Sequence, residues 1–142
     1  MKYLRAFFFA LSLLAVQCAI AHDDATLDAA AAPHGGQLRM AGPYHFELVT
    51  KSNELSVYVT DHAGEKVSTR GVAGSATLLQ GKTSASIPLR AVGDNLVNGS
   101  GKFDLAPETG VMVTLTFPGK STEMANFMPL KKAGPPMRHA MQ

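Results

Sequence analysis

Short stretches in which apolar and polar residues alternate, each followed by a turn, limit the folds open to this chain more than any other feature. Residues 44–49 read Tyr-His-Phe-Glu-Leu-Val and residues 55–60 read Leu-Ser-Val-Tyr-Val-Thr. A period of two is typical of strands with one buried face. Lys51-Ser52-Asn53 lies between the two stretches and is short enough to form a hairpin turn.

The same pattern continues downstream. Residues 76–79 and 83–89 form one pair of such stretches, and residues 111–117 and 121–128 form another. Gly and Asn are frequent in turns, so a further turn is expected at Asn98-Gly99-Ser100-Gly101.

These strands predict an all-β domain over residues 37–130, in which no window has the 3.6-residue period of a helix. We expect a single β-sandwich or barrel, Ig-like, of about seven to eight short antiparallel strands.

Residues 1–21 have the layout of a secretory signal peptide. Lys2 and Arg5 precede an apolar stretch, which ends in the small residues Ala19-Ile20-Ala21. The stretch is short for a membrane span, which needs about 20 apolar residues. Gln17 precedes Cys18, where lipid attachment would require a small residue. We therefore expect cleavage after Ala21, export to the periplasm and no stable membrane insertion of the mature chain.

The composition of the expected mature chain argues against nucleic acid as a partner. Two of the 13 Lys and Arg lie in the signal peptide, which holds none of the 11 Asp and Glu, so the mature formal charge is near zero. The chain also has no Trp on which bases could stack. The single Cys is in the signal peptide, so the mature domain has no disulfide and must be stabilised by its core.

Two segments that flank the expected domain have few large apolar side chains. Residues 22–36 are predicted to be a flexible leader without packed structure that carries candidate metal ligands. Residues 131–142, with consecutive prolines and no periodicity, are predicted to be a disordered tail rich in Met and His.

No arrangement typical of a hydrolase is visible. The chain has neither a Gly-x-Ser-x-Gly nor a His-Glu-x-x-His motif. A Ser-His-Asp triad assembled from distant residues stays open, but the acidic residues lie mostly in turns or in the leader. We predict a protein that is not an enzyme.

Metal binding is the chemistry for which the mature chain is best supplied. It holds all five His and every Met except Met1. Imidazole suits copper, zinc and nickel, and thioether sulfur selects Cu(I). Copper is therefore expected first, with zinc, cobalt or cadmium as alternatives. Binding should weaken below about pH 6.5, where imidazole takes up a proton.

His34 has the most specific context among the candidate ligands. In Pro33-His34-Gly35-Gly36, two residues without side chains follow the imidazole, so their amide nitrogens can fold back toward a Cu(II) ion at the ring. The four residues resemble the core of the prion octarepeat copper site, of which this chain has one copy. The alternative is a turn with a solvated His, and the sequence leaves both open.

His22 is a candidate because cleavage after Ala21 would make it the N-terminal residue. Its amine and ring could then chelate copper as a histidine brace. This arrangement resembles small Ig-like periplasmic copper-resistance proteins whose mature chains begin with His. The alternative is a frayed terminus.

The remaining candidates lie in the first strands and in the tail. His45 and Glu47 share one face of the stretch at residues 44–49 and could, as an exposed pair, complete a site with His34; otherwise His45 is a surface residue. His62 is predicted to be solvated in a turn. In the tail, the spacing of Met137, His139 and Met141 suits loose Cu(I) binding. The alternative is that this spacing is an accident of composition.

Taken together, PHGGQL, GPYHFELV, ELSVYVTDHAGEKV and the later strands up to VMVTLTFPGK resemble a group of small exported proteins of Gram-negative bacteria found alongside heavy-metal efflux systems. His34-Gly35-Gly36, followed by Glu47 and by Asp61 at a strand end, also resembles the N-terminal region of periplasmic adaptor subunits of heavy-metal efflux pumps.

The resemblance implies a periplasmic protein that buffers copper or delivers it to a heavy-metal efflux pump or its adaptor. The chain lacks the long helical hairpin and lipoyl-like segments with which an adaptor bridges two membranes. The main alternative is an interaction module of the cell envelope that binds no metal.

Overall fold

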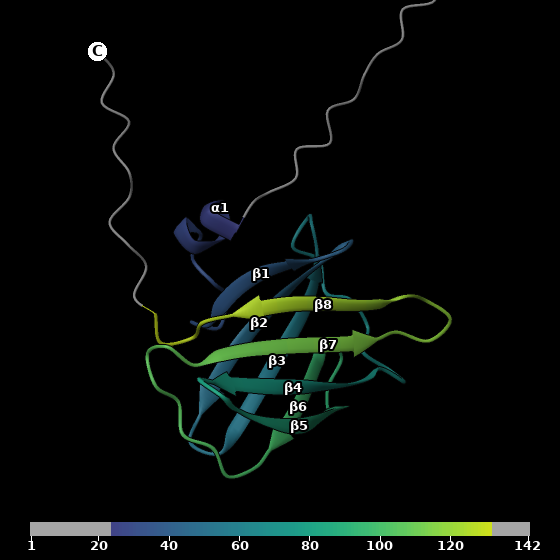
Figure 1. The fold of residues 1–142 in the computed structure, drawn as a ribbon. Coiled ribbons are helices and arrows are strands. Elements are labelled where there is room, and N and C mark those ends of the chain that lie inside the picture. The colour runs from purple at the N-terminus through teal and green to yellow at the C-terminus, as the bar shows by residue number, and fades with distance from the viewer. Residues whose placement is uncertain (1–23, 132–142) are drawn as a thin grey trace, which may run out of the picture.

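A computed structural model describes residues 24–131 of the chain, and all of its strands belong to one antiparallel sheet that curves into a nearly closed barrel (Figure 1). The predicted all-β fold is confirmed. One short helix, α1 (Asp24–Ala29), precedes the strands. The strands are β1 (Gln37–Ala41), β2 (Tyr44–Lys51), β3 (Glu54–Asp61), β4 (Ala73–Gln80), β5 (Thr83–Ala91), β6 (Leu96–Ser100), β7 (Gly110–Thr116) and β8 (Thr122–Phe127).

The strand order β1-β2-β3-β6-β5-β4-β7-β8 contains two overlapping Greek keys. Strands β4, β5 and β6 follow one another as neighbours, with β3 beside β6 and β7 beside β4. The barrel nearly closes where β1 lies next to β8. There the side-chain oxygen of Gln37 accepts a hydrogen bond from the backbone N–H of Met128 at 2.9 Å.

The inward-facing side chains fill the barrel, as the alternating pattern requires. Alternate residues are buried from Tyr44 to Leu48 in β2, from Leu55 to Val59 in β3 and from Val111 to Leu115 in β7, and β8 adds Phe127 from the opposite edge of the sheet. The largest fully buried apolar side chains are Phe46, Phe127, Leu48, Leu55, Leu89 and Leu115. The outward-facing residues of β2 and β3 are therefore fixed on the opposite face.

The first hairpin turns match their sequence signals. Lys51 pairs with Glu54, so Ser52 and Asn53 form a two-residue turn, and Asn53 has a φ of 62°. Between β1 and β2, the turn Gly42-Pro43 has a Gly φ of 56°. These two turns set the register of all three N-terminal strands.

The turn expected at residues 98–101 is wrong, because residues up to Ser100 belong to β6. A Cβ atom on Gly99 would lie 2.3 Å from the carbonyl oxygen of Pro88. Gly99 therefore permits the close approach of β5 and β6 within a strand. It is a glycine because of this packing and not because a turn requires it.

The part of the predicted flexible leader that the structure describes is packed, which corrects that expectation. Leu27 of α1 is buried, and the Arg39 guanidinium of β1 donates a 2.7 Å hydrogen bond to Asp28 and lies 3.7 Å from Asp24. A helix of six residues is not stable alone, so these contacts stabilise it. The sequence missed the helix because its only large apolar residue, Leu27, gives no periodicity.

Replacing Leu27 with alanine is expected to weaken the docking of α1 by about 2 kcal/mol, since it removes a buried side chain. Amide hydrogen exchange at residues 24–36 should become faster, while exchange in β3 stays unchanged. Glu108→Ala, which removes an exposed carboxylate in the loop before β7, is the control and should have little effect. Unchanged exchange in Leu27→Ala would contradict the packing of the helix.

Within residues 24–131, no helix is long and apolar enough to cross a membrane. Residues 131–142 were predicted to be a tail; all of them except Lys131 lie outside the described residues.

Candidate functional site

The candidate site lies on the outer face of β2 and β3, where the segment between α1 and β1 passes over the sheet. Glu47 of β2 and Tyr58 of β3 are directly opposite each other in the antiparallel register. Residues directly opposite share one face of the sheet, with Cβ atoms about 4.5–5.5 Å apart. The Pro33–Gly36 segment brings His34 to both of them.

Glu47 is almost completely buried, with 3% of its side chain exposed, and its carboxylate is surrounded by donors. The backbone N–H of His34 donates to both carboxylate oxygens, at 3.1 and 2.9 Å, and that of Gly36 donates to Oε2 at 3.2 Å. Nδ1 of the His34 ring lies 2.7 Å from Oε1. A buried carboxylate is costly unless such donors replace water, so these contacts explain why Glu47 can be covered.

The His34 ring also lies flat on the ring of Tyr58. The ring centroids are 3.6 Å apart, and the planes differ by 4°. The carboxylate holds one edge of the imidazole and the phenol ring holds one face, so the orientation of His34 is fixed. The side chain nevertheless keeps 42% of its surface exposed.

The Glu47 contact determines which ring nitrogen carries the proton. An ionised carboxylate can only accept hydrogen bonds, so Nδ1 of His34 must donate. In the neutral ring, Nε2 then carries the lone pair.

The glycine amides, in contrast, are engaged elsewhere. The N–H of Gly35 donates to the carbonyl of Ala32 at 3.1 Å, and the N–H of Gly36 donates to Glu47. A chelate of the octarepeat kind would have to break both hydrogen bonds. The segment thus forms a turn, and the side chain of its His34 is packed on Glu47 and Tyr58 with 42% of its surface exposed.

The structure corrects the expected pairing of His45 with Glu47. Glu47 is not exposed, because residues 34–36 cover it, so no exposed pair exists. The His45 ring stacks instead on His62, with centroids 4.8 Å apart and planes 24° from parallel. His62 is exposed but also holds Gly42 through a 3.2 Å hydrogen bond.

The other predicted ligands fall outside the described residues: His22, Met137, His139 and Met141. Within residues 24–131, no three side chains of the His, Cys, Asp and Glu types are grouped as ligands of one ion.

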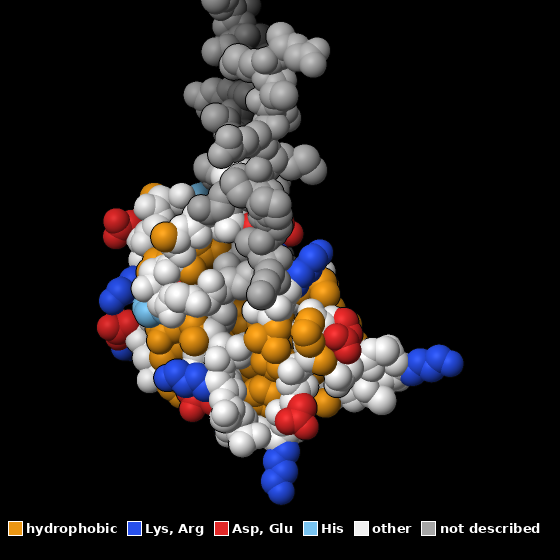
Figure 2. All heavy atoms as spheres, turned by 90° about the vertical axis from the view of Figure 1, so that its left-hand side faces the viewer, with side chains coloured by type: hydrophobic (Ala, Val, Ile, Leu, Met, Phe, Trp, Pro, Cys, Tyr) orange, Lys and Arg blue, Asp and Glu red, His pale blue; other side chains and the backbone are white. Residues whose placement is uncertain are grey.

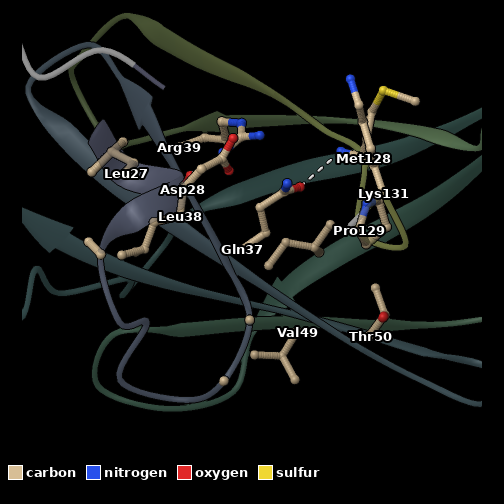
Figure 3. A pocket seen from close by; sticks show the side chains of 14 residues that line it. Leu27, Asp28, Gln37, Leu38, Arg39, Val49, Thr50, Met128, Pro129 and Lys131 are labelled. Carbon is tan, nitrogen blue, oxygen red and sulfur yellow. Dashed lines mark hydrogen bonds and ion pairs between the residues drawn. The ribbon is translucent and has the colours of Figure 1, made fainter. Parts of the chain in front are cut away.

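A cavity of about 450 Å³ lies beside the His34 segment, between α1, β1 and the residues that follow β8 (Figure 3). Gly35 and Gly36 form part of its wall, and Gln37 crosses it to bond Met128. Arg39 at its edge is neutralised by Asp28. The cavity holds none of the histidines discussed above.

Figure 2 shows one face of the barrel, where hydrophobic side chains gather between separate acidic and basic groups. Among the described residues, the exposed large apolar side chains are Leu79, Val92, Met124 and Leu130.

Sequence reasoning missed Tyr58 and the role of His62. Tyr58 could have been predicted as a site residue, because the strand register set by the two-residue turn Ser52-Asn53 places it opposite Glu47. The contact between His62 and Gly42 depends on how the loop after β3 folds, for which the sequence holds no signal.

These residues define a class of site in which a buried carboxylate fixes an outward-facing histidine on a small all-β barrel. The chain matches no protein-family model, and comparisons with curated proteins and with solved structures returned no significant match.

Proposed function

We propose that the protein binds a transition-metal ion in the periplasm, copper in preference to zinc or cobalt, and buffers it or delivers it to a heavy-metal efflux pump or its adaptor. His34 is the anchoring ligand. The observation that carries the proposal is the 2.7 Å contact between Nδ1 of His34 and the buried carboxylate of Glu47.

A histidine that ligates a metal usually donates its other ring N–H to a carboxylate or a carbonyl. That hydrogen bond fixes the tautomer, orients the ring and makes the ligand nitrogen more basic. His34 has this partner in Glu47, and the Tyr58 ring limits its rotation further. A ligand held in this way loses less conformational entropy when it binds an ion.

The remaining ligands in this proposal come from the segments that carried the other sequence predictions. His22 belongs to the same leader as His34 and would add an amine and an imidazole, with water completing a Cu(II) or Zn(II) site. The Cu(I) ligands of the tail would be Met137, His139 and Met141, as a separate, looser site.

Replacing His34 with phenylalanine is expected to weaken the binding of Cu(II) or Zn(II) at least about tenfold, because a phenyl ring can still stack on Tyr58 but has no nitrogen. Calorimetric titration of wild type and variant measures this. Asp104→Asn, which changes an exposed charge between β6 and β7 and leaves the leader intact, is the control and should bind as wild type does.

Equal affinities for wild type and His34→Phe, with both proteins folded by circular dichroism, would refute the metal proposal in this form. An envelope interaction module that binds no metal would then be the better interpretation.

A further inference from the structure

Two histidines and a methionine occupy neighbouring positions at the end of the barrel where the β1–β2 turn lies next to the end of β3. His45 is on the outer face of β2, and His62 follows the last residue of β3. Their rings are stacked, with centroids 4.8 Å apart. The sequence separates these residues by a whole hairpin, and the antiparallel register brings them together.

His62 is held in one tautomer by the turn beneath it. Its Nε2 lies 3.2 Å from the carbonyl oxygen of Gly42, which can only accept a hydrogen bond. Nε2 must therefore donate, and in the neutral ring Nδ1 carries the lone pair. A ring N–H given to a backbone carbonyl is the arrangement typical of a histidine that binds a metal through its other nitrogen.

Met40 completes the group from the neighbouring strand. It is the direct antiparallel partner of His45 in the β1–β2 register, so both side chains are on the outer face. Side chains paired in this way have Cβ atoms about 4.5–5.5 Å apart. Met40 is partly buried, as His45 is, while His62 is exposed.

From this arrangement we infer that His45, His62 and Met40 form a binding site for Cu(I). Thioether sulfur is a soft ligand that selects Cu(I), and imidazole nitrogen accepts the same ion. Two nitrogens at about 2.0–2.1 Å from one ion are about 3.3–4.2 Å apart, depending on the angle between them. In the structure the two rings are 24° from parallel, so at least one of them must turn about its side-chain bonds before both nitrogens point at one ion.

The site does not depend on the site proposed for His34. It uses other residues, another set of ligand atoms and another oxidation state of copper. Its test can therefore be made in the His34→Phe background, where the two proposals succeed or fail separately.

The test is a titration of the purified protein, expressed from its complete sequence, with Cu(I) under anaerobic conditions against a chromophoric Cu(I) chelator. In the His34→Phe background, His45→Gln, His62→Gln and Met40→Leu should each lower the Cu(I) affinity about 10- to 100-fold. Met124→Leu, which changes an exposed methionine on β8, is the matched control and should leave the affinity unchanged.

A second measurement does not depend on the folding of any variant. With methionine methyl groups labelled by ¹³C, one equivalent of Cu(I) should shift the Met40 methyl signal together with the ring protons of His45 and His62. The inference would be overturned if the Met40 signal and both ring signals stayed in place while the methyl signals of Met137 and Met141 shifted. Equal Cu(I) affinity of the three ligand variants and the Met124→Leu control would overturn it as well.

Discussion

Replacing Glu47 with alanine is expected to lower the free energy of unfolding by about 2–4 kcal/mol and to release the His34 ring. The carboxylate accepts hydrogen bonds from two backbone N–H groups and from the ring Nδ1, and alanine leaves these partly buried donors without an acceptor. Denaturant unfolding measures the loss of stability. Calorimetry with Cu(II) or Zn(II) should show weaker binding in the same variant, because the ring is no longer oriented.

The control for this prediction is Glu65→Ala, which removes an exposed carboxylate and should change stability little. Glu47→Gln keeps the size of the side chain but replaces one acceptor oxygen with a donor, so an intermediate loss is expected. A Glu47→Ala protein as stable as wild type would show that the carboxylate does not hold the His34 segment.

Gly36→Ala is expected to displace the His34 segment from the sheet, with a loss of about 1–3 kcal/mol in the free energy of unfolding. A Cβ atom there would be 2.3 Å from the backbone carbonyl oxygen of Leu48 and 2.9 Å from the Val49 side chain. Neither the strand backbone nor the segment can yield without breaking the Gly36 hydrogen bond to Glu47. The upfield ring-current shift that Tyr58 gives the His34 ring protons should therefore be lost.

The neighbouring glycine is a matched control. Gly35→Ala introduces strain because Gly35 has a φ of 74°, but no atom lies within 4 Å of the added Cβ. It should cost about 1–2 kcal/mol and keep the ring-current shift of His34. If both variants keep that shift, close packing of Gly36 on β2 is not what positions the histidine.

The barrel strands were largely predictable because burial enforces the alternation that the sequence shows. In β2 and β3, Phe46, Leu48 and Val57 face inward as their period of two requires, and a short turn joins the two strands. Gly99 led to the wrong prediction of a turn because glycine is favoured both in turns and where two strands approach closely. Only the position of Pro88 in the fold distinguishes the two cases.

The candidate site was predictable only in part. His34 and Glu47 were both singled out, but the burial of Glu47 depends on a loop crossing the sheet, which has no periodic signal. The stacking of His45 on His62 likewise depends on a loop that returns toward the β1–β2 turn. Burial and loop geometry arise from tertiary contacts, so they cannot be read from local sequence.

We propose that Glu47 fixes the proton on Nδ1 of His34 and leaves Nε2 for a metal. Long-range ¹H–¹⁵N correlation spectra of the histidine rings, recorded during a titration with Zn(II), test it directly. We expect that in the free protein Nδ1 of His34 is protonated and Nε2 has the signal of a nitrogen with a lone pair, which shifts when Zn(II) is added. A proton on Nε2 in the free protein, or an Nε2 signal that Zn(II) leaves in place, would contradict it.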